Sequence, residues 1–375
     1  MAPSPSPTLA ADYLREIAQR FDFAGPVTRI IPFGNGHIND TFLCECQLAP
    51  LQVRQYALQN INTRVFREPD KVMENIARVT AHLRQKLVQT GHEDIDRGTL
   101  SIVPTRTGDT LHRDGEYAWR SYDFIPGALT HDVVTTDLQA YEAARMFARF
   151  QHLLDDLPAP RLHETIPHFH HTPTRFARLR DAIARDPAGR AASCRHELAA
   201  AFARADQVSR IVDAMAAGHV PERITHNDTK INNILFDGTA GHACCVIDLD
   251  TVMPGSSLYD FGDMVRTFTG EFAEHETDLS KVVFRRDRFT ALVDGYLSEA
   301  RGFLTPAELD LLAFSGRLIT FEIGIRFLTD YLEGDTYFKV HHPRENLDRA
   351  RTQLQFVAAM EHQAAEMGAI VAQHR

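Results

Sequence analysis

The stretch that decides the fold is Ile224-Thr225-His226-Asn227-Asp228-Thr229-Lys230-Ile231-Asn232-Asn233-Ile234-Leu235-Phe236, followed by Val246-Ile247-Asp248-Leu249-Asp250. Apolar residues lie on both sides of a polar loop. Two short apolar runs, 234–236 and 243–247, flank the turn-forming pair Asp237-Gly238, and this pattern predicts a β-hairpin. Because a hairpin brings its two outer ends together, Asn233 and Asp248 are expected to lie side by side.

An amide oxygen and a carboxylate at one strand end suit a hard cation such as Mg²⁺. Asp228 stands on the same loop and is near enough to orient or deprotonate a nucleophile next to that metal. The order Asp-x-x-x-x-Asn, hairpin, Asp is the kinase-type arrangement for phosphoryl transfer. The alternative is that these polar residues only cap turns, but three of them at this spacing around one hairpin favour the catalytic interpretation.

The pattern His226-x-Asp228-x-x-x-x-Asn233 with Ile247-Asp248 resembles the aminoglycoside phosphotransferase/choline kinase superfamily. The fuller wording, His-Asn-Asp-Thr-Lys-Ile-Asn-Asn with Ile-Asp-Leu-Asp-Thr-Val-Met-Pro-Gly, is similar to that of the N-acetylhexosamine 1-kinases. The resemblance implies an α+β, bilobal protein-kinase-like fold with an antiparallel sheet plus a helix in the N-terminal lobe and a larger, mostly helical C-terminal lobe. We expect a nucleotide-binding lobe at 1–118, a hinge at 119–127, where Ile125-Pro126-Gly127 breaks the strand pattern, and a catalytic and acceptor-binding lobe at 128–375.

The same resemblance implies ATP and Mg²⁺ as cofactors and a sugar hydroxyl as acceptor, most closely the anomeric 1-OH of N-acetylglucosamine or N-acetylgalactosamine. Asp228 is then the catalytic base and contacts the acceptor, and Asn233 and Asp248 hold the metal. His226 and Asp260 are expected to support the loop. Asp260 opens an Asp-Phe-Gly tripeptide, but Asp248, which ends the hairpin strand, is the better metal ligand; Asp263 is expected at a helix start.

In the N-terminal lobe, a strand at 27–33, a loop with Gly34 and Gly36, and a strand at 41–44 could fold over ATP phosphates, because glycines let backbone N–H groups approach the oxygens. The loop is neither Gly-x-Gly-x-x-Gly nor a P-loop, so an ordinary hairpin is the alternative. We assign Gly34 and Gly36 to the nucleotide. His37 is assigned to the acceptor.

The third strand, 53–59, ends in Gln59, where kinase folds usually place a lysine that pairs with the phosphates. Either Arg64, Arg67 or Lys71 reaches in, or nucleotide binding is weaker. The helix that Pro69 opens carries Glu74, which is either the usual partner of that lysine or a solvated residue. By resemblance, hinge residues Asp123, Phe124 and Ile125 join Gln59 as nucleotide-binding candidates.

On the acceptor side, Thr305-Pro306-Ala307-Glu308 is a capping box that starts a long helix. Its charged residues Glu322, Arg326 and Asp330 fall on one face, either as a solvated ion-pair row or with Arg326 turned to the acceptor. By resemblance, Arg326 and Tyr337 bind the sugar. Pro167 interrupts the histidine-rich run 163–171, which disfavours a metal site there. By resemblance, this run is a loop beside the acceptor.

Composition limits the other possibilities. The 375 residues carry a net charge of −10, which disfavours a nucleic-acid partner. The cysteine count of five is odd and predicts reduced packing residues. Residues 1–7 lack signal-peptide features and are expected to be a disordered lead-in. No apolar run approaches the ~20 residues of a membrane span. We expect a cytoplasmic protein with a small-molecule sugar substrate, no membrane association and no obligate protein partner.

Two alternatives stay open. The chemistry could serve another acceptor, such as an aminoglycoside, choline, homoserine or a different sugar. Choline would need an aromatic cage and an aminoglycoside an acidic loop, whereas Arg326 and the many histidines favour a neutral polyol. A nucleotide-binding pseudokinase is the other alternative; Gln59 supports it, and the complete set of Asp228, Asn233 and Asp248 argues against it.

Overall fold

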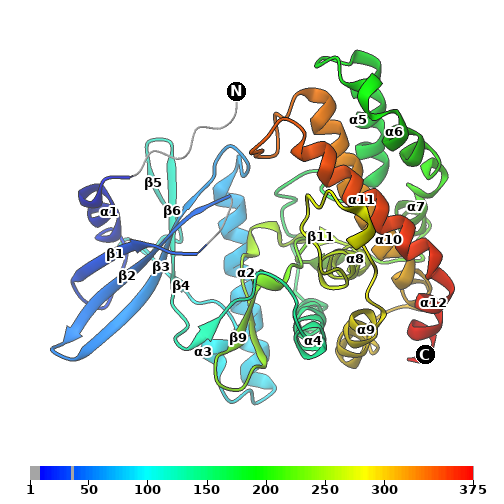
Figure 1. Ribbon diagram of the computed structural model, residues 1–375. Helices are drawn as coiled ribbons and strands as arrows, with labels where there is room; N and C mark the ends of the chain where they lie inside the picture. Colours follow the sequence, from blue (N-terminus) through cyan, green and yellow to red (C-terminus); the bar gives the residue numbers. More distant parts are fainter. Residues whose placement is uncertain (1–8, 35–37, 375) are drawn as a thin grey trace.

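The computed structural model describes residues 9–34 and 38–374. The expected lead-in and the loop residues Gly36 and His37 lie outside the described residues. The chain forms two lobes, an antiparallel sheet on one side and a helical body on the other, which confirms the predicted α+β bilobal fold (Figure 1).

The sheet of the N-terminal lobe has six strands in the order β1-β2-β3-β6-β4, with β5 also paired to β6. Its helices are α1, α2 and the short α3. The bounds are α1 Ala11–Ala18, β1 Val27–Pro32, β2 Asp40–Ala49, β3 Gln52–Ile61, α2 Pro69–Gln89, α3 Ile95–Gly98, β4 Ile102–Val103, β5 His112–Asp114 and β6 Tyr117–Asp123.

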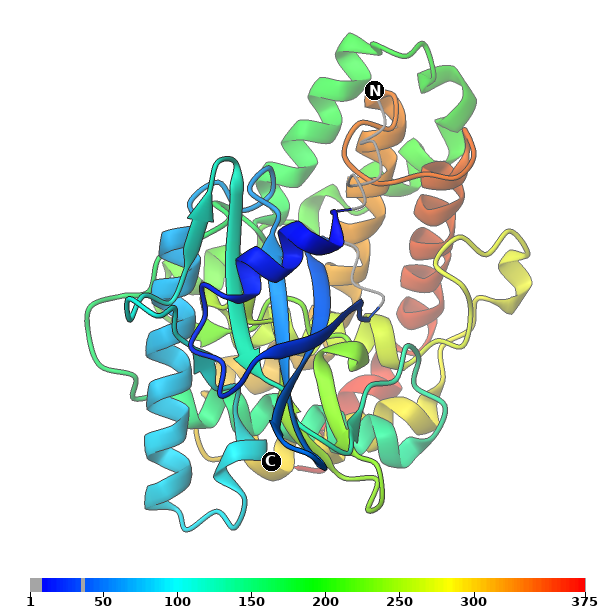
Figure 2. The ribbon, with the colours of Figure 1, turned by 90° about the vertical axis from the view of Figure 1, so that its left-hand side faces the viewer.

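Two apolar clusters hold this sheet in place. Leu14 and Ile17 of α1 pack with Tyr56, Leu58 and Trp119 on the outer face, where Figure 2 shows α1 crossing in front of the strands. On the inner face, α2 packs with Ile61, Ala118 and Tyr122 in a cluster that continues into the C-terminal lobe. The inner face of the sheet is therefore turned toward the catalytic segments.

The C-terminal lobe is built on helices, with two small sheets ordered β10-β9-β7 and β11-β8. Its helices are α4 Asp137–Leu154, α5 Thr172–Arg185, α6 Arg195–Phe202, α7 Arg210–Ala216, α8 Ser257–Phe268, α9 Arg286–Ala300, α10 Pro306–Glu333, α11 Glu345–His362 and α12 Ala364–Ala372. Its strands are β7 Ala128–Leu129, β8 Arg223–Thr225, β9 Ile234–Asp237, β10 Ala243–Val246 and β11 Met253–Gly255. None of the helices in the described ranges is long and apolar enough to cross a membrane.

The spacing of apolar residues predicts helices over 8–22, near 195–217 and from Pro343 to about 367, and these boundaries were wrong. The first helix ends at Ala18, and Phe21 then pairs with Thr105. The second predicted helix is divided into α6 and α7, and Arg204 at the break bonds Glu361 on α11. The last helix divides at Gln363. In each case a tertiary contact or a local backbone change interrupts a pattern that is helical throughout.

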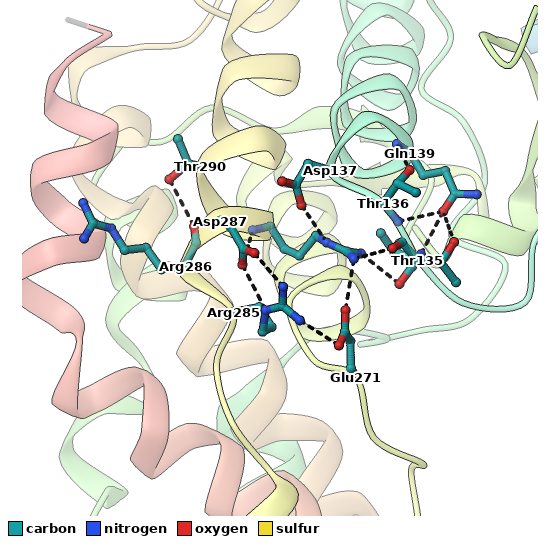
Figure 3. A network of polar contacts seen from close by, with 11 residues as sticks. Thr135, Thr136, Asp137, Gln139, Glu271, Arg285, Arg286, Asp287 and Thr290 are labelled. Carbon is teal, nitrogen blue, oxygen red and sulfur yellow. Dashed lines mark hydrogen bonds and ion pairs between the residues drawn. The ribbon is translucent and has the colours of Figure 1, made fainter.

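A polar network anchors the start of α4 (Figure 3). Thr136 and Gln139 form a capping box there. From α9, Arg288 donates to the carbonyl oxygens of Val134 and Thr135 at 2.9 and 2.5 Å and pairs with Asp137 at 2.7 Å. This fixed end matters because the other end of α4 supports the catalytic loop.

Candidate active site

The loop after β8 is held by Asp260 of α8. One carboxylate oxygen of Asp260 accepts from the backbone N–H of His226 at 2.9 Å, and the other accepts from that of Asn227 at 2.7 Å. Gln151 of α4 donates to the same carboxylate at 2.7 Å. Asp260 is fully buried, so each of these bonds replaces one that water would otherwise make. These contacts fit the support role expected for Asp260.

His226 and Asn227 set the backbone path of this loop. His226 is buried, packs edge-on to Phe147 at 5.3 Å, and its Nε2 bonds the carbonyl oxygen of Ile247 at 2.9 Å. Asn227 has a left-handed φ of 65° and uses its side-chain amide to bond the carbonyls of Thr225 and Thr251. The loop is thereby tied to both the hairpin and the segment that follows it.

The predicted hairpin is confirmed. Strands β9 and β10 pair antiparallel, with Val246 opposite Ile234. The backbone N–H of Ile247 donates to the carbonyl oxygen of Asn233 at 2.9 Å. Asp248 comes next, with a left-handed φ of 57°. The hairpin therefore delivers Asn233 and Asp248 to the same end, as its geometry requires.

Asp228 lies directly beside Asn233. The Asn233 side-chain amide donates to the Asp228 carbonyl oxygen at 2.8 Å and to its carboxylate at 3.1 Å. Lys230 pairs with the other carboxylate oxygen at 2.8 Å. Burial acts to raise the pKa of Asp228, but the charge of Lys230 outweighs it and the pKa lies below its ordinary value. Sequence reasoning passed over Lys230, although its place two residues after Asp228 was a usable signal.

The charges at this end suit a divalent cation. Burial, together with the nearby Asp250 and Asp228, raises the pKa of Asp248 to about 6. A cation would relieve that crowding of carboxylates. Within the described ranges, no group of three or more His, Cys, Asp or Glu residues could hold a metal by itself. Mg²⁺ is commonly held by one or two carboxylates plus substrate phosphates, so Asn233 and Asp248 fit it.

Gln59 accepts a hydrogen bond from an arginine that sequence reasoning missed. Arg120 of β6 is the cross-strand partner of Gln59, and its Nε donates to the Gln59 side-chain oxygen at 2.9 Å. Arg120 also forms an ion pair with Asp250, and both side chains are at most 2% exposed. An arginine inside the apolar strand at 117–123, next to Trp119, was the signal available.

None of the cations suggested for this place contacts Gln59, and neither does Glu74 of α2. Lys71 pairs with Glu68 at 2.7 Å, and the contacts of Gln59 include neither Arg64 nor Arg67. Glu74 is about half exposed and bonds His163 at 2.8 Å, away from Gln59. The lysine–glutamate pair that is usual in kinase folds is absent from this part of the described chain, and the Arg120–Asp250 pair lies there.

The backbone donors at the predicted hinge are used within the N-terminal lobe. The N–H of Asp123 donates to Ser101 O at 2.9 Å and that of Phe124 to Gln55 O at 3.2 Å, so both donors are used within the lobe. Ile125 follows, with a buried side chain. The Phe124 ring lies edge-on to Phe33 at 5.4 Å, just before Gly34, which has a φ of 78°.

Arg326 lies among aromatic rings on the acceptor side. Its guanidinium carbon is 5.6, 6.0 and 5.7 Å from the ring centres of Phe169, Tyr337 and Phe338. A pocket that is open to solvent lies here. It is lined by Arg175, Arg178, Arg326, Thr329, Asp330, Tyr337 and Phe338. The structure therefore brings Arg326 and Tyr337 together.

The alternative of a solvated ion-pair row on α10 was wrong. Glu322 and Asp330 are buried. Asp330 accepts from the backbone N–H groups of Thr336, Tyr337 and Phe338 at 2.8–2.9 Å and so shapes the loop after α10. Asp263 was also misplaced at a helix start: it lies inside α8 and pairs with Arg266 at 2.8 Å.

One residue of the histidine-rich run, His170, is buried and connects two other segments. His170 bonds Glu322 through Nδ1 at 2.9 Å and the carbonyl oxygen of Asn227 through Nε2 at 3.0 Å. Thr172 donates to the second oxygen of Glu322 at 2.7 Å. Helix α10 is thus linked to the catalytic loop through His170, a link that no sequence spacing indicated.

Comparison with known proteins agrees with this architecture. The model of the phosphotransferase enzyme family, APH, matches residues 29–292, and the chain belongs to this family. Among solved structures, a microcompartment-associated aminopropanol kinase is similar at a TM-score of 0.58 and 15% identity, over 96% of this chain and 99% of that one. A spectinomycin phosphotransferase in complex with ADP and spectinomycin is similar at a TM-score of 0.58 and 12% identity, over 95% of this chain and 99% of that one.

A choline kinase from Cryptosporidium parvum Iowa II gives a TM-score of 0.54 and 12% identity, over 97% of this chain and 99% of that one. At such identities the likeness shows a shared fold. The expected superfamily is confirmed, and the chain is a member of a phosphotransferase family with a kinase-like fold.

Proposed function

We propose that the protein transfers the γ-phosphoryl group of ATP to a hydroxyl group of a small molecule, with a sugar as the acceptor. The observation that carries this proposal is the direct contact between Asp228 and Asn233 at the hairpin end that also carries Asp248. A proton acceptor beside a metal-binding amide and carboxylate is what phosphoryl transfer needs, because that reaction depends on positioning and charge neutralisation.

The roles of the chain's own groups follow from their contacts. Asp228, ionised because of Lys230, accepts the hydroxyl proton and aims the oxygen at the γ-phosphate. Asn233 holds Asp228 in place through two hydrogen bonds. Mg²⁺ held by Asn233 and Asp248 supplies charge neutralisation for the phosphates when it is bound. His226 and Asp260 keep the loop in register.

For the nucleotide, we propose that residues 119–127 act as the hinge between the lobes. The N–H groups of Asp123 and Phe124 already donate within the lobe, so we assign adenine to the remaining backbone groups at 124–125. Gly34, which follows β1, has a left-handed φ, and we assign it to the phosphates of the nucleotide. A donor such as ATP supports a cytoplasmic location for the reaction.

For the acceptor, we propose N-acetylglucosamine or N-acetylgalactosamine, phosphorylated at the anomeric 1-OH. Arg326 and Tyr337 bind it in the pocket between α5, α10 and the loop after α10. In the described part of the chain, Arg326 has no hydrogen bond or ion pair to a protein group, so its fork of donors remains for a hydroxyl or amide oxygen. The aromatic rings around Arg326 offer apolar surface to a sugar.

A coupled ADP-release assay across acceptors tests this assignment. We expect turnover with N-acetylhexosamines and little with choline, homoserine or aminoglycosides. Asp228→Asn should lower turnover by about 10²–10⁴-fold, the usual contribution of a general base, without unfolding the protein. Asp294→Asn, in a partly exposed ion pair with His374, is the matched control.

Near-normal turnover in Asp228→Asn would remove Asp228 from its role. Binding of Mg-ATP without turnover on any acceptor would favour a pseudokinase. Turnover confined to another acceptor would keep the phosphotransfer chemistry and overturn the sugar specificity.

A further inference from the structure

A buried ion pair joins the two lobes next to the metal-holding segment. Arg120 comes from β6 of the N-terminal lobe, and Asp250 lies two residues after Asp248 in the C-terminal lobe. Their side chains are 1% and 2% exposed. Taking two charges out of water is costly, and an apolar pair of similar volume is often at least as stable. The position that this pair fixes between the two lobes therefore explains its presence better than a gain in folding stability does.

The pair lies where the strand lysine would act. Gln59 is the cross-strand neighbour of Arg120 and orients it, accepting from Nε at 2.9 Å. The Gln59 amide is itself held, because it donates to Thr41 Oγ1 of β2 at 2.9 Å. On the α2 side, Met73 stands against Arg120, with its sulfur 3.9 Å from Nη1. Within the described residues, no carboxylate of α2 contacts Arg120, and the carboxylate that pairs with Arg120 is that of Asp250.

Asp250 also holds the loop that precedes β2. Its second oxygen accepts from the side-chain amide of Asn39 at 2.6 Å. The Asn39 oxygen in turn accepts from the backbone N–H of Asn62, at the end of β3, at 3.0 Å. One carboxylate thus connects the strand with Arg120, the residue Asn39 just before β2, and the segment that carries Asp248.

We propose that Arg120 is a positioning residue for the nucleotide. It takes the place of the lysine that kinase folds usually carry on β3, because it holds the sheet, together with Asn39, against Asp250. The inference rests on the proposed use of Mg-ATP but not on which acceptor is phosphorylated. Since Asp250 lies two residues after Asp248, loss of these contacts displaces the N-terminal sheet and the Asp248 segment relative to each other. The acceptor pocket, on α5 and α10, is built from other elements and is left intact.

Mg-ATP binding measured by calorimetry, together with steady-state kinetics, tests the proposal. We expect Arg120→Met to raise the Kd for Mg-ATP about tenfold or more, within the range of typical coupling between sites, and to leave the acceptor KM unchanged. Arg120→Lys should do nearly as much, because an ammonium cannot bond Gln59 and Asp250 together as the guanidinium fork does. Asn39→Ala, at a partly exposed position, should weaken Mg-ATP binding even if the Arg120 variants fail to fold.

A matched control comes from a second arginine–aspartate pair. Arg97 of α3 pairs with Asp237 of β9 at 2.7 Å, both partly exposed, and it joins the N-terminal lobe to the hairpin away from Asp250. Arg97→Met therefore removes a similar pair between the same parts of the molecule. It should leave the Kd for Mg-ATP unchanged, although it can lower the melting temperature.

A rescue experiment gives the sharpest outcome. If Arg120 does the work of a strand lysine, the double variant Gln59→Lys with Arg120→Met should recover part of the Mg-ATP affinity that Arg120→Met alone loses. The proposal is overturned if folded Arg120→Met and Asn39→Ala bind Mg-ATP as the wild type does. It is also overturned if only Asp250→Asn weakens binding, which would make Asp250 a metal ligand in its own right. Calorimetry needs no acceptor, so failure of the sugar assignment would leave this test standing.

Discussion

The buried contacts of His170 with Glu322 of α10 and with Asn227 predict the direction and size of a change in stability. His170 donates to the carbonyl oxygen of Asn227 through Nε2, so that nitrogen carries a proton. Nδ1 faces the Glu322 carboxylate at 2.9 Å. Burial acts to lower the pKa of His170, but Glu322 outweighs it and the pKa is raised. Burial likewise acts on Glu322, yet His170 keeps its pKa below the ordinary value.

We therefore predict that Glu322→Gln destabilises the fold through an unpaired buried imidazolium. The variant keeps the volume of the side chain and an acceptor for Thr172, but it removes the charge. Removing one partner of a buried pair costs about 3–5 kcal/mol, whereas an exposed pair is worth about 0–1 kcal/mol. Glu322 is fully buried, so the larger figure applies.

The pH dependence follows from the direction of the pKa shift. Because the folded pKa of His170 lies above the unfolded value of about 6.5, the pair contributes fully below that pH and less as the pH rises through the folded value. The difference between wild type and variant should be largest near pH 6 and smaller near pH 9. The other titratable groups near His170 are Asp263, through its charge, and Tyr259, whose ring is 5.4 Å away.

Urea unfolding of the wild type and Glu322→Gln at both pH values measures the effect. Glu361→Gln is the control, since Glu361 pairs with Arg204 at 2.6 Å but is 31% exposed. A loss in Glu322→Gln no larger than in the control, or one that is the same at both pH values, would refute the buried imidazolium. Turnover should also fall in the folded variant, because Asn227 precedes Asp228.

Three further predictions concern other parts of the site and its support. Arg326→Ala should raise the acceptor KM while leaving the Kd for Mg-ATP unchanged; equal effects on both would place Arg326 outside the acceptor pocket. Asp260→Ala leaves two buried backbone N–H groups and the Gln151 amide without their acceptor, and at about 1–3 kcal/mol each this should lower the free energy of unfolding severely. In Gly295→Ala, the new methyl group meets the backbone of Tyr141 where α4 crosses α9, so the melting temperature should fall while both KM values stay unchanged.

The elements that follow from local patterns were predictable. Pro69 starts α2, and the Thr305 capping box starts α10, because caps and first-turn prolines act within a few residues. The hairpin around Asp237-Gly238 was predictable for the same reason, and with it the meeting of Asn233 and Asp248. Helix interruptions near Ala203 and Gln363 were missed, since the chain there remains helical in composition.

Contacts between distant segments could not be predicted in this way. Sequence reasoning correctly saw that Gln59 was unusual, but it sought the replacement cation on the following segment at Arg64, Arg67 or Lys71. In the structure, the cation beside Gln59 is Arg120 of the neighbouring strand. Likewise the spacing of Glu322, Arg326 and Asp330 placed them on one side of a helix without showing that two of them are buried against other elements.

The sequence alone determined the order of catalytic groups around one hairpin, because a turn and its two strands interact over a few residues and need no other part of the chain to find their register. Only the tertiary structure decided which charges from distant segments meet. Arg120 and Asp250 are far apart along the chain, and so are His170 and Glu322. A buried charge requires a partner, but burial results from packing the whole chain, so its partner is known only once the chain is folded.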